Sequence, residues 1–381
     1  MKSMFAFALL TIGLFITGCQ PPVHSGSSTA DAAKPVDTVI KPEAETPEPI
    51  EAQPSYELLV TNAKGNTVTF INPANWETEQ VQAGAAPYGI VLGPKHRAYV
   101  TTAEGVAVID TREKKRVALV PYRHPISAVQ YGEYRPGGMG IGISPDGKYV
   151  YAGVYLSNSP SQLEIIDTEK LQVTGSVQVG KRPFDIVVST DGTEIYSIDH
   201  DSYSVTVVQS DTLKSRTIEL TPLGRGGFDK PHYAALGADG TLYLPYQGKV
   251  LAAFDPKSGR SRSIPLSAQT HQHGIAKNAD GSKLYIVGTG AAGGAVQGPS
   301  LTIFDMNDRS ERILPLQNNR LHEKVAVSPD ERWAYVTGGH TFANQGWDGI
   351  SVVQLQTGEI REVPIADEPL DIVILTKEPQ A

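Results

Sequence analysis

Apolar and polar residues alternate over short stretches of this chain, and turn-forming residues separate one stretch from the next. Two such stretches are "GVAVIDT" from Gly105 and "LEIIDT" from Leu163. A period of two residues is typical of β-strands, and breaks rich in Gly, Asp, Asn and Pro are typical of tight turns. The pattern therefore predicts an all-β protein built from short antiparallel strands.

A longer pattern repeats along the chain. Each unit has a Pro or equivalent start, a short apolar strand, a turn such as "SPDG", a strand centred on Tyr, and a further strand that ends in Asp. Consecutive units begin 41 to 51 residues apart, at Pro87, Gly138, Pro183, Pro231, Gln272 and His322. Four short strands in such a period form one blade of a β-propeller.

The two ends of the repeat region are incomplete in complementary ways. "EPLDIVIL", from Glu368 to Leu375, has the pattern of a first strand alone, and "LLVTNAKGNTVTFINPANWETEQVQ" has that of the second to fourth strands. Together they complete a seventh blade. The sequence thus predicts a seven-bladed β-propeller with four-stranded antiparallel blades, closed by the C-terminal strand joining the N-terminal three, an arrangement that removes free sheet edges.

The segments "LLVTNAKGNTVTFIN", "SPDGKYVYAG" and "SPDERWAYVTGG" resemble the YVTN family of seven-bladed propellers, which is related in shape to lactonase-type and amine-dehydrogenase-type propellers. The resemblance covers nearly all of Tyr56 to Leu375. It implies the fold more strongly than any activity, because propellers of this shape include catalysts, electron-transfer subunits and binding modules.

The first 55 residues differ from the rest. Residues 1–18 have the order of a secretory signal, one basic residue and then an apolar stretch. "ITGC" resembles the lipobox of bacterial lipoproteins, which implies cleavage before Cys19, the only cysteine, and its acylation. Residues 19–55, rich in Pro, Ala and Glu, predict a flexible tether to a propeller at residues 56–381. Gln20, where no Asp stands, resembles lipoproteins of the outer membrane, and we expect the propeller to face the periplasm.

Insertions and histidines concentrate on one face of the predicted propeller, which we call the top face: the loops that enter each innermost strand and those between the second and third strands. Long loops on a rigid scaffold commonly carry function. Three blades place a candidate metal ligand at one equivalent position before the innermost strand, and two further histidines flank it. The set that predicts a copper or zinc site is His232, His271, His273, His322 and Glu323, with His200 and His340 as outer members. Alternatively, these side chains are polar loop residues.

Other top-loop residues are candidates for binding an anionic ligand, although solvated charges are the simpler interpretation. They are Arg123, Arg135, Arg182, Arg225 and Lys230, and Trp347 is an aromatic candidate. Asp110, Asp167, Asp255 and Asp305 each end a third strand, and their recurrence marks them as turn formers. The chain has no C-x-x-C-H motif for haem of the c type.

Two functions from different classes follow. The first is a lipid-anchored binding or scaffold propeller whose top face recognises a protein, glycan or small ligand. The second is a metal-dependent oxidoreductase or a lactonase-like hydrolase centred on the histidine set. The formal net charge of −8 argues against a nucleic-acid binder, which would need a basic surface. We also expect the protein to be a monomer.

Overall fold

The computed structural model of the protein describes residues 55–224, 230–246, 248–270, 273–288, 298–316, 320–340 and 346–377. The chain divides into two units, residues 1–51 and 52–381, and the described residues all belong to the second. Cys19, the leader and most of the tether lie outside them. In the described part of the chain, no helix is long and apolar enough to cross a membrane.

Twenty-eight strands in this described part form seven four-stranded antiparallel sheets, numbered here as blades 1 to 7. From the innermost strand outward, blades 1 to 3 are β28 (Pro369–Thr376), β1 (Tyr56–Asn62), β2 (Thr67–Ile71) and β3 (Thr78–Gln82); β4 (Ile90–Gly93), β5 (Arg97–Thr101), β6 (Gly105–Asp110) and β7 (Lys115–Pro121); and β8 (Gly137–Ile143), β9 (Tyr149–Tyr155), β10 (Gln162–Asp167) and β11 (Gln172–Gln178).

Blades 4 and 5 are β12 (Pro183–Val188), β13 (Glu194–Asp199), β14 (Ser204–Gln209) and β15 (Ser215–Glu219); and β16 (Ala235–Leu236), β17 (Leu242–Tyr246), β18 (Val250–Asp255) and β19 (Arg260–Pro265). Blades 6 and 7 are β20 (Ile275–Lys277), β21 (Lys283–Gly288), β22 (Ser300–Asp305) and β23 (Glu311–Pro315); and β24 (Val325–Val327), β25 (Trp333–Thr337), β26 (Gly349–Gln354) and β27 (Ile360–Pro364). One 3₁₀ turn, His200–Ser202, follows β13.

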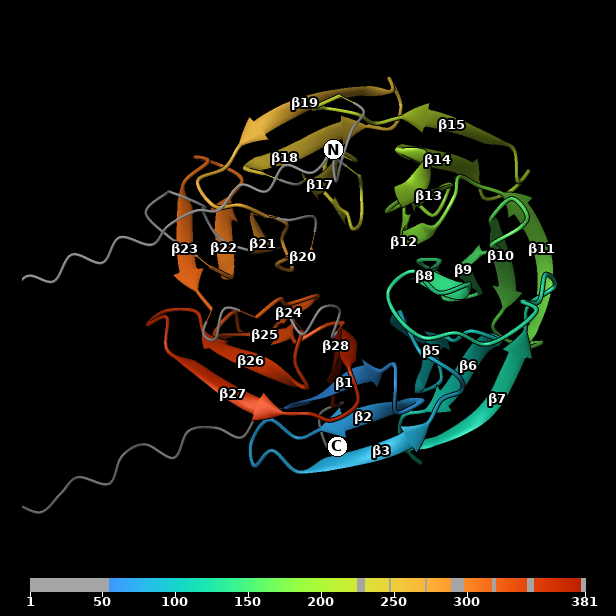
Figure 1. The fold of residues 1–381 in the computed structure, drawn as a ribbon, viewed down its shortest axis with the longest axis horizontal. Coiled ribbons are helices and arrows are strands. Elements are labelled where there is room, and N and C mark those ends of the chain that lie inside the picture. Colours follow the sequence, from blue (N-terminus) through green and yellow to red (C-terminus); the bar gives the residue numbers. More distant parts are fainter. Residues whose placement is uncertain are drawn as a thin grey trace, which may run out of the picture. The chain divides into compact units, whose positions relative to one another are not determined.

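The seven sheets stand in a ring around one central axis, and the first strand, β1, lies beside the last, β28, in blade 1 (Figure 1). β28 pairs antiparallel with β1, from Tyr56 opposite Thr376 to Asn62 opposite Pro369. This confirms the predicted seven-bladed propeller, the blade count and the closing strand. Blade 1 is therefore the only sheet of the described part built from both ends of the sequence.

Apolar side chains fill the spaces between neighbouring blades, as alternation along each strand requires. Seven buried clusters each combine residues of two adjacent blades. Six of them have ten or eleven fully buried members among the described residues, whereas the cluster between blades 3 and 4 has seven. An eighth cluster lies where the innermost strands begin.

The aspartates that end the third strands form turns, as their recurrence predicts. A carboxylate oxygen of Asp110 accepts hydrogen bonds from the backbone N–H groups of Arg112 and Glu113, and Asp167 accepts them from Glu169 and Lys170. These bonds lower the pKa of both carboxyl groups. Their local role is turn formation.

Three buried threonines connect one blade to the next. The Thr61 hydroxyl donates to the carbonyl oxygen of Tyr88 in blade 2 and accepts from the backbone N–H of Asp371 in its own blade. Thr101 and Thr337 make the same pair of contacts at two other blade junctions. One hydroxyl therefore ties two innermost strands together just beneath the top face.

We expect Thr61→Val to lower the free energy of unfolding by about 1–3 kcal/mol, because it removes the donor to the buried Tyr88 carbonyl group without changing side-chain volume. Urea unfolding followed by tryptophan fluorescence measures the change. Thr61→Ser keeps the hydroxyl and is the matched control. Equal stability of the Val and Ser variants would show that this bond does not support the ring.

Candidate functional site at the channel mouth

One residue at the same place in each repeat lies at or just before the start of the innermost strand. Four of the seven are aromatic or apolar, and they pack together with Ala63 and Tyr155 in one buried cluster: Tyr88, Met139, Phe184 and Leu370. The position expected before the innermost strand falls inside it in three blades, since Met139, Phe184 and Leu370 belong to β8, β12 and β28. We call the space around these residues the channel mouth.

The other three equivalents are the polar residues His232, His273 and Glu323, and all three are buried. The His232 ring lies 4.6 Å from the Phe184 ring, measured between centroids. His273 Nδ1 lies 3.4 Å from Glu323 Oε2. The structure thus brings three of the five residues predicted for a metal site to equivalent buried positions, in contact with aromatic side chains.

Glu323 is held by two neighbours. The Tyr233 hydroxyl donates to Glu323 Oε1 at 2.6 Å, and His273 contacts the other carboxylate oxygen. The Tyr88 hydroxyl is 3.4 Å from that of Tyr233. The Lys324 ammonium lies 3.6 Å from the centre of the Tyr233 ring, on the side of the channel. Tyrosine, histidine and carboxylate therefore form one connected polar group inside an aromatic wall.

The charges in this group are unequal. Burial acts to lower the pKa of His273, but the hydrogen bond and negative charge of Glu323 raise it above its ordinary value of 6.5. Burial acts to raise the pKa of Glu323, but His273 brings it well below its ordinary value. Burial and the nearby charge of Glu323 raise the pKa of Glu133. Two carboxyl groups at one site with pKa values moved apart are suited to different roles.

The outer histidines also reach the mouth. The His200 ring lies 4.4 Å from His232 and 4.8 Å from Phe184, and its Nδ1 is 2.8 Å from Asp201 Oδ1. Burial lowers the pKa of His200. His340 lies 5.8 Å from the Tyr88 ring, and its Nδ1 bonds the Glu368 carboxylate. Both histidines therefore contact residues of the channel mouth.

His322 is engaged elsewhere. Its Nε2 lies 2.8 Å from the Ser351 hydroxyl and its Nδ1 3.0 Å from the Arg320 carbonyl oxygen, and burial lowers its pKa to about 4. A metal ligand needs a ring nitrogen for the ion. No group of three or more His, Cys, Asp or Glu side chains in the described residues is arranged to hold a metal. His271 lies outside those residues, and the five-residue metal set stays a prediction.

The cationic candidates serve the protein itself. Arg135 is buried and donates to three backbone carbonyl groups, including those of Ala86 and Gly138, so it is not a solvated charge. Arg182 pairs with Asp201 at 2.8 Å and lies between the Tyr134 and Tyr155 rings. Lys230 pairs with the same Asp201 at 2.9 Å.

The last candidates are peripheral. Trp347 is buried beside His322, with 6.0 Å between ring centroids. Arg123 is exposed, with its backbone N–H bonded to Glu164. Arg225 lies outside the described residues.

Sequence reasoning missed Glu133, Tyr134 and Tyr233. Glu133 Oε1 is 3.9 Å from His232 Nε2, and the Tyr134 ring is 5.7 Å from that of His200. Both residues come from "YGEYRPGG" in the long loop that precedes β8. The length of this loop indicated that it could carry function. The repeat pattern does not show which side chains of the loop point toward the mouth.

The fold is that of a seven-bladed β-propeller. The family model described as "Lactonase, 7-bladed beta-propeller" matches residues 63–226, in agreement with the resemblance noted from the repeats. No curated protein matches the chain in sequence.

Solved structures share the fold at low sequence identity. The periplasmic gluconolactonase of Pseudomonas aeruginosa is 16% identical with a TM-score of 0.60, covering 85% of this chain and 99% of that one. Hydrazine synthase of Kuenenia stuttgartiensis is 19% identical, with a TM-score of 0.55 and coverage of 82% and 93%. A protein of unknown function from Desulfotomaculum acetoxidans is 13% identical, with a TM-score of 0.62 and coverage of 84% and 99%. At these identities the likeness concerns the fold.

We expect Glu323→Gln to lower the pKa of His273, because the amide keeps the hydrogen bond to Tyr233 but removes the charge that favours the imidazolium. The stability that Glu323 gives through His273 is fully present below about pH 6.5 and is lost as the pH rises through the raised folded-state pKa. NMR titration of the histidine ring and unfolding between pH 5 and 9 measure both effects.

The control is Glu331→Gln, whose carboxylate pairs with Lys283 away from the mouth. It should leave the His273 titration unchanged. A His273 pKa that is the same in the wild type and in Glu323→Gln would contradict the assigned pair.

Proposed function

We propose that this protein is a cell-envelope binding propeller whose channel mouth takes a small polar ligand with a ring-sized apolar face. The observation that carries the proposal is the composition of the mouth, where aromatic rings lie in contact with the buried His232, His273 and Glu323. Small-molecule sites commonly combine apolar walls with a few convergent polar groups whose pKa values are perturbed. A sugar or sugar acid has this combination of faces.

The contacts of the mouth support binding through stacking and hydrogen bonds together. The Phe184, His200 and His232 rings lie within 4.8 Å of one another by centroids, with Phe184 edge-on to His200 and the other two pairs tilted, so they form one packed aromatic group. Tyr233, His273 and Glu323 supply donors and an acceptor that are already oriented by each other. Preorganised polar groups lower the ordering cost of binding.

A second candidate is hydrolysis of a lactone at the same mouth. It is favoured by the match to the lactonase family model and by the opposite pKa shifts of Glu133 and Glu323. Glu323 would accept a proton from the attacking water, and Glu133, the carboxyl group whose pKa is raised, would donate one to the ring oxygen as the carbon–oxygen bond breaks. No metal is needed for either transfer.

We expect His232→Ala to weaken ligand binding by about tenfold, because it removes a ring from the packed aromatic group. Calorimetric titration with neutral sugars, sugar acids and glucono-δ-lactone supplies the probes. His124→Ala is the control, since His124 is a top-face histidine bonded to Glu164 outside the mouth.

Saturable binding of one probe by the wild type and by His124→Ala, weakened in His232→Ala, supports the proposal. No binding by the wild type, or equal binding by all three, contradicts it. Acid release from the lactone above the uncatalysed rate, lost in Glu133→Gln, identifies the hydrolase instead.

We further propose that acylation of Cys19 anchors the protein in the outer membrane on the periplasmic side, with the tether of residues 19–55 between lipid and propeller. The support is the "ITGC" motif and the composition that follows it. Several acyl chains on one residue give stable anchoring, which a single chain does not.

We expect Cys19→Ser to move the protein from the membrane fraction to the soluble fraction and to abolish labelling with radioactive palmitate. Gln20→Asp is the comparison: it should keep the label but shift the protein to the inner membrane on a density gradient. Membrane association of Cys19→Ser equal to that of the wild type would contradict lipid anchoring.

A further inference from the structure

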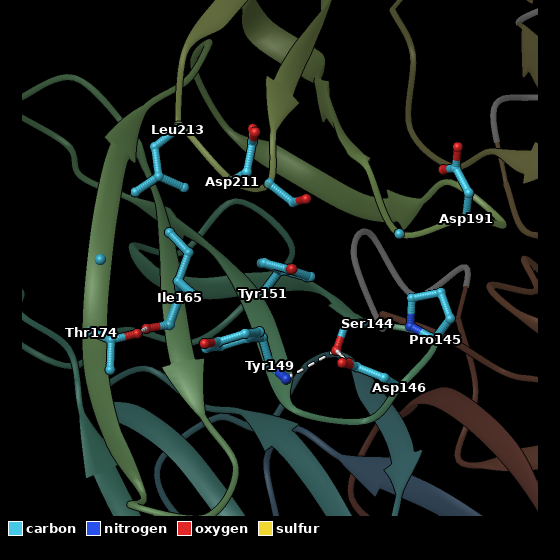
Figure 2. A pocket seen from close by; sticks show the side chains of 13 residues that line it. Ser144, Pro145, Asp146, Tyr149, Tyr151, Ile165, Thr174, Asp191, Asp211 and Leu213 are labelled. Atoms are coloured by element: carbon cyan, nitrogen blue, oxygen red, sulfur yellow. Dashed lines mark hydrogen bonds between the residues drawn. The ribbon is translucent and has the colours of Figure 1, made fainter.

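A crevice on the face opposite the channel mouth separates blades 3 and 4. Its volume is about 530 Å³. Tyr149, Tyr151 and Ile165 line it from blade 3, and Asp191, Asp211 and Leu213 from blade 4 (Figure 2). It coincides with the smallest of the seven apolar clusters between blades. The crevice therefore lies where fewer apolar side chains pack between neighbouring blades than at the other six junctions.

The repeat shows what is omitted. In blades 4 to 7 a Tyr on the second strand has an Arg two strands further out, through the paired rows Tyr196–Val207–Arg216, Tyr243–Ala253–Arg262, Tyr285–Ile303–Arg312 and Tyr335–Val352–Arg361. The same row in blade 3 is Tyr151–Ile165–Gly175. Glycine stands where four other blades have arginine.

Three of these four arginines contact the next blade. Arg216 donates to the carbonyl oxygen of Pro256, and Arg312 donates to those of Leu355 and Gln356, in each case just after the third strand of the neighbouring blade. Arg361 instead lies over the Trp76 ring of blade 1. The equivalent backbone positions facing Gly175 are Ser210 and Asp211, which line the crevice.

Two other blades supply a cation by a different route. Arg97 donates to the Thr168 carbonyl oxygen at 3.0 Å across the junction of blades 2 and 3, and Lys114 pairs with Glu57 at 3.1 Å and Glu79 at 3.4 Å at that of blades 1 and 2. Within the described residues, the crevice between blades 3 and 4 is lined by no Lys, Arg or His. The five junctions described above thus contain a cation that this crevice lacks.

The chemistry of the lining favours a cation. Asp191 and Asp211 contribute two carboxyl groups, and hydrogen bonds from Ser189 and Thr193 lower the pKa of Asp191. The third carboxyl group, of Asp146, already pairs with the Lys148 ammonium at 2.9 Å. Tyr151 is 3% exposed and lines the crevice. Aromatic faces, carboxylates and carbonyl groups are the environment in which guanidinium groups bind.

We propose that this crevice binds a guanidinium group supplied from outside the chain, in the place that Arg216 and Arg312 of the chain itself occupy at their own blade junctions. The guanidinium fork donates to the Ser210 and Asp211 backbone carbonyl groups and lies against the Tyr151 ring. The group belongs either to a free guanidino compound or to an arginine side chain of a partner polypeptide.

The central experiment fills the crevice from within. In Gly175→Arg the new side chain takes the ligand's place, and in Gly175→Ala the crevice stays open. A Cβ at residue 175 would approach only the flexible tips of Leu213, at 3.0 Å, and Ile165, at 3.4 Å, so both variants make the same contact. Titration calorimetry of the full-length chain uses agmatine, the amide of Gly-Arg-Gly, and butylammonium as probes.

We expect saturable binding of agmatine or the peptide to the wild type and to Gly175→Ala. Gly175→Arg should weaken it by about tenfold or more, and butylammonium should bind about tenfold more weakly because it lacks the planar fork. Tighter binding of the peptide identifies a partner side chain as the source, and tighter binding of agmatine identifies a free compound.

Thermal unfolding gives an independent readout. Gly175→Arg should melt about 2 °C or more above Gly175→Ala, because the internal guanidinium reproduces the contacts of Arg216 and Arg312. Absence of binding by both guanidinium probes at 10 mM, or binding that is unaltered in Gly175→Arg, would overturn the proposal.

Discussion

The pairing of β28 with β1 is the interaction on which the rest of the structure depends. It joins the two ends of the sequence in one sheet and so fixes seven innermost strands around a common axis. Once the ring is closed, residues near the start of different innermost strands come together in one buried cluster. Closure of the ring therefore determines where the site lies, and the sequence determines which side chains occupy it.

Residues that recur in several blades support the fold, whereas positions whose side chain differs between blades are the candidates for function. Asp110 and Asp167 recur because each blade needs the same turn, and Thr61, Thr101 and Thr337 recur because neighbouring innermost strands need the same connection. The channel-mouth position recurs in the backbone but not in the side chain. Departures from a repeat therefore carry more functional information than its conserved pattern, and Gly175 is a departure of the same kind on the opposite face.

The sequence was sufficient for the blade count, the closing strand and the equivalence of His232, His273 and Glu323, because all three follow from a period along the chain. It was insufficient for His322, whose ring is bonded to Ser351, 29 residues away. It missed Glu133 because an insertion has no period. Gly175 escaped notice for a related reason: the register between β10 and β11 shifts after Ile165, which hides its equivalence to the arginines of other blades.

The two faces also differ in how their charges are balanced, and this difference selects different ligands. At the mouth, Glu323 is paired with His273, and Asp201 with His200, Arg182 and Lys230. A charged ligand there would have to displace a partner that is already bonded and buried, so a neutral or weakly charged polar compound fits at lower cost. In the crevice, Asp191 and Asp211 have no cationic partner among the described residues. A cation can enter there without breaking an existing pair.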